Sequence, residues 1–163
     1  MCIADGARQG EAKKFFALSA DLTAWTPASV PHDLKPAAGQ TATPWKSPGP
    51  TWFRKSFMLP AAQAGKEMTL VLWVDGEESA FVWINGHELV RCAAPRQGFS
   101  RLREYVVRAG VLREKNVLAI EVINVFGSGG LPRGPLRLEA RGASSCYHPD
   151  YDADDNSFLW FPW

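Results

Sequence analysis

Nowhere in this chain do apolar residues recur over ten or more residues with the 3.6-residue period of an amphipathic helix. Short apolar or alternating runs stand instead between residues typical of turns, chiefly Gly, Pro and Asn. Six runs predict strands: TWFRKSFML (51–59), MTLVLWV (68–74), ESAFVWI (78–84), HELVRC (87–92), NVLAIEVIN (116–124) and GPLRLEA (134–140). Short strands at close spacing are typical of an antiparallel β-sandwich, so we expect an all-β fold.

Two dipeptides, Asp75-Gly76 and Asn85-Gly86, predict hairpins, because both residue pairs favour the tight turns that join antiparallel neighbours. The run 68–74 is apolar in both registers and is expected to be buried on both faces. Within 116–124, Leu118, Ile120 and Val122 share one face. Three tryptophans lie inside predicted strands and are expected in the core: Trp52, Trp73 and Trp83.

The 163 residues suit one domain with a core of its own, and we divide the chain into three parts. Residues 1–44 are rich in proline and are expected to be an extended segment packing on the sandwich, with a short helix only in ARQGEAKKFFAL (7–18). Residues 45–141 form the predicted sandwich. Residues 142–163 form a tail that is acidic in the middle and apolar at its end, FLWFPW, which should dock on the sandwich or on a partner.

A formal net charge of +1 argues against a nucleic-acid or anionic-membrane partner, which would select a basic excess. Three cysteines leave an odd one, which fits incidental thiols better than a disulfide framework. The first residues, MCIADGARQGEAKKFF, lack the apolar stretch of a signal peptide. We therefore expect either a cytoplasmic protein or a piece of a longer secreted or periplasmic one.

The order of several segments is similar to a known family. These segments are TWFRKSFMLP, GKEMTLVLWVDGEESAFVWINGHELV, GFSRLREYVVRAGVLREKNVLAIEVIN and GGLPRGPLRLEA. Together they resemble the sugar-binding, galactose-binding-like jelly-roll domain of glycoside hydrolase family 2 enzymes such as β-galactosidases, also found in sialate O-acetylesterases. The resemblance covers roughly residues 45–140, and in it a loop precedes the strand NVLAIEVIN.

This resemblance implies a non-catalytic domain that lies beside a separate catalytic domain. The chain is too short to hold such a domain too, so we expect a carbohydrate-binding or accessory domain with no enzymatic activity of its own. The alternatives are a structural or protein-interaction module that binds no sugar, and a fragment of a glycosidase or esterase. The implied partners are a carbohydrate and the catalytic domain of a larger protein.

The adjacent carboxylates Glu77 and Glu78 invite a catalytic interpretation. The two carboxyl groups of a glycosidase must converge on one bond from about 5 to 9.5 Å apart. Neighbouring residues of a strand point to opposite faces, so we expect no catalytic pair here. Two interpretations remain open. Glu77 and Glu78 are both solvated residues beside a hairpin turn, or one of them binds a sugar.

Sugar binding needs an aromatic ring for stacking and planar polar side chains for the hydroxyls. Candidates are polar or aromatic residues at predicted strand ends and in loops. The strongest candidate is Asn124, at the predicted end of a strand. A role in capping the following turn is an equal alternative for this residue. The full predicted set is Trp45, Glu77, Arg96, Phe99, Asn124 and Arg133.

Alternating carboxylates in the tail, Asp150, Asp152 and Asp154, suggest a weak metal site of the calcium-loop type. The glycine and the glutamate that such a loop needs are missing at the matching positions, which favours a solvated acidic tail. We therefore expect no cofactor. A structural calcium ion, common in sandwiches of this resemblance, stays open.

Overall fold

A computed structural model describes residues 1–28, 32–33, 49–75, 79–91, 100–124, 130–131, 136–140 and 158–160. At the ends of several strands, among them Trp73 and Asn124, it describes the backbone alone. Within these residues the helical structure is limited to one short 3-10 helix, η1 (Ala61–Gln63). Everything else that is regular is β-structure, which confirms the predicted all-β class.

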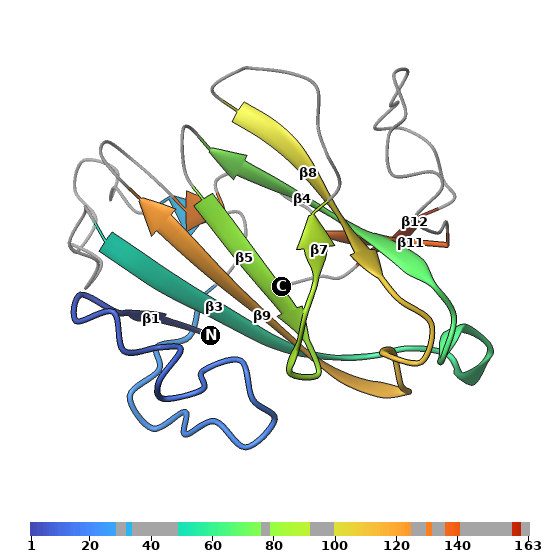
Figure 1. Cartoon of the computed structure of the whole chain (residues 1–163), viewed down its shortest axis with the longest axis horizontal. Helices are drawn as coiled ribbons and strands as arrows, with labels where there is room; N and C mark the ends of the chain where they lie inside the picture. Colours follow the sequence, from blue (N-terminus) through green and yellow to red (C-terminus); the bar gives the residue numbers. More distant parts are fainter. Residues whose placement is uncertain are drawn as a thin grey trace.

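Two five-stranded antiparallel sheets make up the molecule (Figure 1). The first sheet has the order β1 (Cys2–Ala4), β3 (Gly49–Met58), β9 (Lys115–Asn124), β5 (Ser79–Ile84), β6 (His87–Glu88). The second has the order β12 (Phe158–Trp160), β11 (Arg137–Glu139), β4 (Met68–Asp75), β8 (Ser100–Val107), β7 (Val90–Arg91). A two-strand ladder joins β10 (Gly130–Leu131) to β2 (His32–Asp33).

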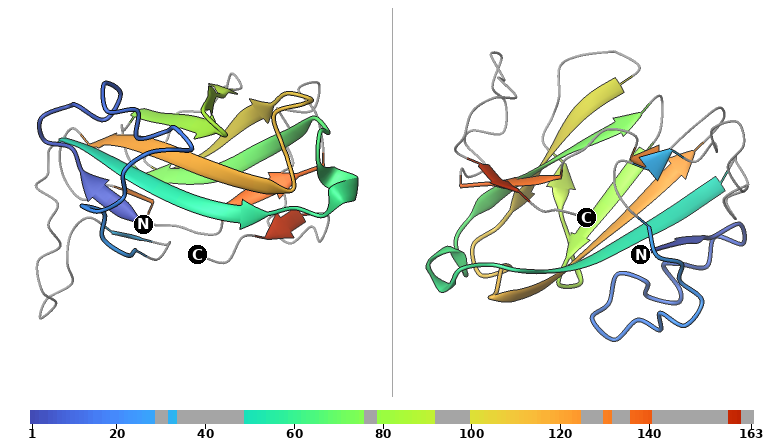
Figure 2. Two further views of the ribbon diagram at one scale, coloured as in Figure 1. Left: turned by 90° about the horizontal axis from the view of Figure 1, so that it is seen from below. Right: turned by 180° about the vertical axis from the view of Figure 1, so that it is seen from behind.

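The chain passes repeatedly from one sheet to the other, and the two sheets pack face to face (Figure 2). β3 lies in the first sheet, β4 in the second, β5 and β6 in the first, β7 and β8 in the second, and β9 in the first again. Sandwiches of the jelly-roll type are built from such crossings. The predicted antiparallel β-sandwich is therefore confirmed.

The core lies between the two sheets. The face predicted for Leu118, Ile120 and Val122 is buried in it, opposite leucines of the second sheet such as Leu70 and Leu138. The hydroxyl of Tyr105, on β8, donates a hydrogen bond of 2.9 Å to the carbonyl of Ala80, on β5. This bond satisfies a buried hydroxyl and ties the two sheets together.

The run 68–74 is expected to be buried on both faces of its sheet. This is confirmed for Met68 through Leu72 of β4, which are all buried. Strand β8 is not among the strands predicted from the sequence. It pairs with β4 along its whole length, from Met68 opposite Val107 to Asp75 opposite Ser100. Its sequence, SRLREYVV, contains several charged residues, so the alternation of a half-buried strand is not obvious. Arg103, Tyr105 and Val107 alternate along the strand and are buried.

One of the two predicted hairpins is wrong. The strands on either side of Asp75-Gly76 do not pair, because β4 lies in the second sheet and β5 in the first. The connection crosses between sheets instead of folding back. HELVRC likewise divides into β6, in the first sheet, and β7, in the second.

The other hairpin is confirmed, since β5 and β6 pair across Asn85-Gly86. Both turn residues have positive φ, 53° at Asn85 and 83° at Gly86, as the type I′ turn requires. The side chain of Asn85 donates to the carbonyl of Val111 (2.8 Å) and to Oδ1 of Asn116 (2.9 Å). Its own oxygen accepts from the backbone N–H of Val117.

The predicted short helix between residues 7 and 18 is wrong, because this segment is a series of turns. Its hydrogen bonds mix three-, four- and five-residue spacings, as in Lys14 to Glu11, Lys13 to Gln9 and Phe15 to Gly10. Lys14 adopts a φ of 52°, which a right-handed helix does not allow. The bonds that this segment makes to the sheet, described below, take the place of helical ones.

We predict that Asn85→Ala lowers the free energy of unfolding by about 2–4 kcal/mol, because it removes three hydrogen bonds, one buried and two partly buried, and strains a left-handed residue. Asn85→Gly is the matched variant, since it loses the same hydrogen bonds without the strain. It should lose about 1 kcal/mol less than Asn85→Ala in urea unfolding. Equal losses would contradict the role assigned to the positive φ.

Candidate functional site

Strand ends of both sheets gather at one end of the sandwich. In the first sheet Gly49 lies opposite Asn124, and Ser79 lies opposite Ile123. In the second, Asp75 lies opposite Ser100. Four peptide units, at most about 14 Å when fully extended, separate Asp75 from Ser79. The two groups of ends therefore lie at the same end of the molecule, at the upper left in Figure 1.

Most of the sugar-binding residues predicted from the sequence are attached to these strand ends by short stretches of chain. Glu77 belongs to the connection 76–78, Phe99 directly precedes Ser100, and Trp45 comes four residues before Gly49. Arg96 and Arg133 belong to the connections 92–99 and 132–135. These five residues lie outside the described part of the chain, as do Glu78 and the tail residues Asp150, Asp152 and Asp154.

Asn124 is the predicted site residue whose backbone the structure describes. It is the last residue of β9, so the expectation that the strand runs out at this asparagine is confirmed. The two residues before it on the buried face, Ile120 and Val122, belong to the core. Its role in sugar binding and the roles of the other five residues stay predictions.

A second feature lies on the outer face of the first sheet, where residues 1–28 cover β3, β9 and part of β5 (Figures 1 and 2). Aromatic side chains from both layers form a separate cluster there, which we call the aromatic cluster: Phe15, Phe16, Trp25, Trp52 and Trp83. Trp52 and Trp83 are stacked with their ring centres 5.0 Å apart, and Phe16 stacks on Trp83 at 5.3 Å. Phe15 meets Trp25 and Trp52 edge-on.

The expected burial of Trp52 and Trp83 is confirmed, although they lie outside the inter-sheet core. Trp25 is buried as well, against Phe15. Neighbouring residues on β3 explain the two cores, because Phe53 points between the sheets and Trp52 points the other way. A strand with aromatics in both registers thus serves two clusters at once.

Two charged side chains attach residues 1–28 to the sheet. Buried Arg54 donates to the carbonyl of Phe15 (2.9 Å) and to that of Leu18 (3.2 Å). The carboxylate of Asp5, within the segment, accepts from the indole N–H of Trp52 on β3 (3.3 Å) and from the backbone N–H groups of Gln9 (2.8 Å) and Gly10 (2.6 Å). These bonds pair otherwise costly buried charges with main-chain groups of the covering segment.

Close to these anchors lies Glu121, a buried carboxyl on β9. It is 7% exposed, and its register partners on the same face are Trp52 of β3 and Phe81 of β5. Within the described residues no hydrogen bond or ion pair reaches its carboxyl group, whose oxygens keep contact with solvent. Sequence reasoning missed this residue, because an outward-pointing glutamate in NVLAIEVIN reads as solvated.

The surroundings of Glu121 favour its neutral form. Burial, together with the negative charges of Glu11 and Asp5 and against a smaller opposite effect of Arg8, raises the pKa of Glu121 to about 7. The group is therefore largely protonated below neutral pH and can donate as well as accept a hydrogen bond. No arrangement of three or more His, Cys, Asp or Glu side chains suited to a metal ion occurs among the described residues.

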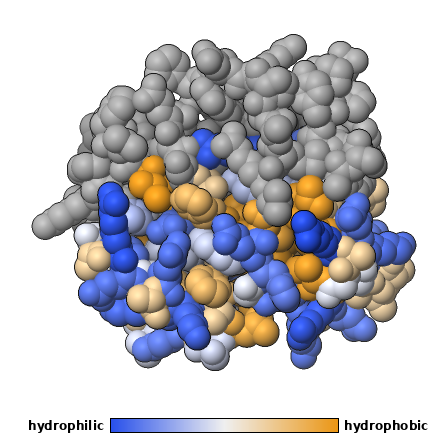
Figure 3. Space-filling view, viewed as in Figure 1, coloured by the Kyte–Doolittle hydropathy of each residue, from blue (hydrophilic) through white to orange (hydrophobic). Residues whose placement is uncertain are grey.

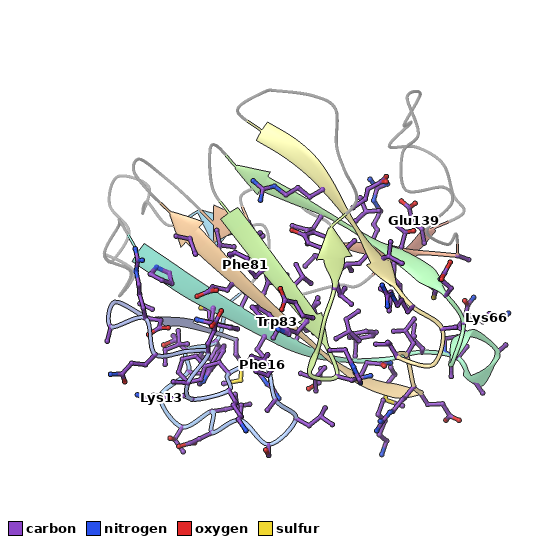
Figure 4. All side chains as sticks on the ribbon, viewed as in Figure 1. Lys13, Phe16, Lys66, Phe81, Trp83 and Glu139 are labelled. Atoms are coloured by element: carbon purple, nitrogen blue, oxygen red, sulfur yellow. The ribbon has the colours of Figure 1, made fainter. Side chains whose placement is uncertain are left out.

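The surface of this face is mixed. Phe81, 40% exposed, lies beside Trp83 with ring centres 6.5 Å apart, and Figure 4 shows Phe81, Trp83 and Phe16 following one another toward the N-terminal segment. Apolar and polar residues alternate over the described part of the view in Figure 3. None of the helical structure in the described residues is long and apolar enough to cross a membrane.

Comparison with known proteins finds a distant relative, and no family model matches the chain. The relative is a β-glucuronidase of Paenibacillus borealis, 30% identical over 90 residues, which are 55% of this chain and 14% of the relative. Part of this chain is therefore distantly related to a β-glucuronidase, a family 2 glycoside hydrolase. The chain spans only a small part of that enzyme's length.

We predict that Gly10→Ala destabilises the fold by about 1–3 kcal/mol, because the added methyl group would collide with the indole of Trp52 and the carboxylate of Asp5. Gly6→Ala is the matched control, since a methyl group there meets nothing within 4 Å. Thermal and urea unfolding of both variants would test this. Equal stability of the two variants would contradict the close packing of residues 1–28 on the sheet.

The raised pKa of Glu121 predicts that stability falls as pH rises. The folded state holds the proton up to about pH 7 and the unfolded state only up to about 4.5, so this contribution is full below 4.5 and is lost as pH rises through 7. Relative to wild type, Glu121→Gln should gain about 1–3 kcal/mol between pH 5 and pH 8. Glu114→Gln, which changes an exposed carboxylate, is the matched control, and a pH-independent difference for Glu121→Gln would argue against this assignment.

Proposed function

We propose that this chain is a non-catalytic carbohydrate-binding domain that accompanies an enzyme of the family 2 glycoside hydrolase type. The observation that carries the proposal is the gathering of strand ends from both sheets at one end of the sandwich. The chain segments that contain Trp45, Glu77, Arg96 and Phe99 start or stop at those ends. Residues far apart in the sequence can thus contribute to one site there.

The chemistry of these residues suits a sugar. A tryptophan offers a flat apolar face for the C–H groups of a pyranose ring, and an asparagine, a carboxylate and guanidinium groups can each bind a pair of hydroxyls. In the proposed mechanism the ring stacks on Trp45, with Phe99 beside it. Glu77, Arg96, Asn124 and Arg133 form the hydrogen bonds that fix its orientation.

We place the hydrolytic chemistry outside these 163 residues. The distant β-glucuronidase relative is far longer than the matched segment, which leaves room there for a separate catalytic domain. In that arrangement the carbohydrate would be one partner of this domain and the catalytic domain the other. A glucuronide is the first ligand to try, since the relative's name refers to that sugar class.

The test is a calorimetric titration of the domain with glucuronides, galactosides, mannans and xylans. Saturable binding to one class is expected, and Trp45→Ala combined with Asn124→Ala should weaken it at least about tenfold, since a stacking contact and a hydrogen bond are lost together. Met58→Ala combined with Lys115→Ala is the matched control, because these residues form the opposite end of the same strand pair.

Two results would count against the proposal. If the control pair weakens binding as much as the test pair, the site is not at this end of the sandwich. If the folded domain binds none of the sugars, the structural or protein-interaction role takes its place. In that role, exposed apolar residues such as Leu18 and Met58 would contact another domain.

A further inference from the structure

Glu121 and Phe81 form a pair of neighbouring side chains that belongs to neither hydrophobic cluster of the sandwich. They lie directly opposite each other on neighbouring strands and on the same face of the sheet. Side chains in such a pair have Cβ atoms about 4.5–5.5 Å apart, close enough for one ligand to touch both. The pair lies on the outer face of the first sheet, away from the inter-sheet core and separate from the strand ends described above.

The carboxyl group of Glu121 makes no hydrogen bond or ion pair within the described residues, whereas the nearby Asp5 accepts two backbone bonds. The residue as a whole is only 7% exposed, but its carboxyl oxygens still contact solvent. A ligand can therefore reach these oxygens and replace water as their hydrogen-bond partner.

The neighbouring rings offer a flat apolar contact. Phe81 is 40% exposed and lies next to Trp83, which in turn stacks on Phe16. This gives a row of aromatic side chains that is open to solvent at Phe81. A partner that is apolar throughout would cover Phe81 but would also seal Glu121 away without a hydrogen bond, which is unfavourable.

We propose that Phe81 and Glu121 form a second carbohydrate-binding site, in which a neutral sugar ring stacks on Phe81 and one of its hydroxyls hydrogen-bonds Glu121. A pyranose ring has both features that this pair requires, an apolar C–H face and hydroxyls at its edge. The choice of a sugar rests on the proposed function. The position of the site rests on the geometry of Phe81 and Glu121 alone.

Other charges around Glu121 suggest a competing ligand that the test must separate. Glu11 and Asp5 are negative and Arg8 is positive, so the local field would also attract an organic cation. A cation would need the ionised carboxylate and would bind chiefly above about pH 7. A sugar hydroxyl can pair with either form of the carboxyl group, so sugar binding should persist at about pH 5.5.

The experiment is a calorimetric titration of the whole chain with oligosaccharides of the four classes named above, at about pH 5.5 and 8.5. Tetramethylammonium is the cation probe. The test variants are Phe81→Ala and Glu121→Leu. The controls are Met58→Ala and Glu114→Leu, which remove an exposed apolar side chain and an exposed carboxylate elsewhere. Because the carboxyl group of Glu121 makes no hydrogen bond within the described residues, Glu121→Leu should not unfold the protein, and thermal unfolding checks this.

The expected result is that each test variant weakens sugar binding about threefold to tenfold at both pH values, with the controls unchanged. Unchanged binding in both test variants overturns the second site. If Trp45→Ala with Asn124→Ala still abolishes binding in that case, the proposed function stands without it. Binding of tetramethylammonium alone overturns the sugar assignment, and silence toward every probe overturns both proposals.

Discussion

The ten-residue pairing of β3 with β9 is the constraint on which the rest of the structure depends. It runs without a break from Gly49 opposite Asn124 to Met58 opposite Lys115. Because side chains alternate along each strand, this one register directs Phe53 into the core between the sheets and Trp52 to the opposite face. A shift by one residue would exchange the two faces and destroy both clusters.

The outer face of this sheet is covered by a segment that has little regular structure of its own. Residues 1–28 contain one three-residue strand and otherwise turns, and their order comes from the sheet below. Arg54 supplies donors for two carbonyls of the segment, and Asp5 accepts from two of its amides. The buried charges thus replace a helix's internal hydrogen bonds, which is why a segment rich in good helix formers does not form a helix.

The proposed binding surfaces differ in what supports them. The strand-end site draws on residues recognised from the sequence and on the backbone geometry of the strands that carry them. The pair of Phe81 and Glu121 emerged only from the structure, because strand pairing brings them together and no local pattern marks either one. A carboxyl that contacts solvent beside an exposed aromatic ring is a better indication of a sugar ligand than the ring alone, since it adds a hydrogen-bond partner for a hydroxyl.

Local physical chemistry determined which residues are strands, where β3, β4, β5, β9 and β11 run, and the turn at Asn85-Gly86, since alternation and turn conformations depend on neighbouring residues alone. The candidate site could be predicted only as a set of residues near strand ends. Tertiary structure decided which sheet each strand joins. The strands on either side of Asp75-Gly76 belong to different sheets, and β8 pairs with β4 although the sequence predicted no strand there. Tertiary structure also brought Glu121 close to Asp5 and Glu11, more than 100 positions earlier in the chain, and such long-range contacts leave no trace in a local sequence pattern.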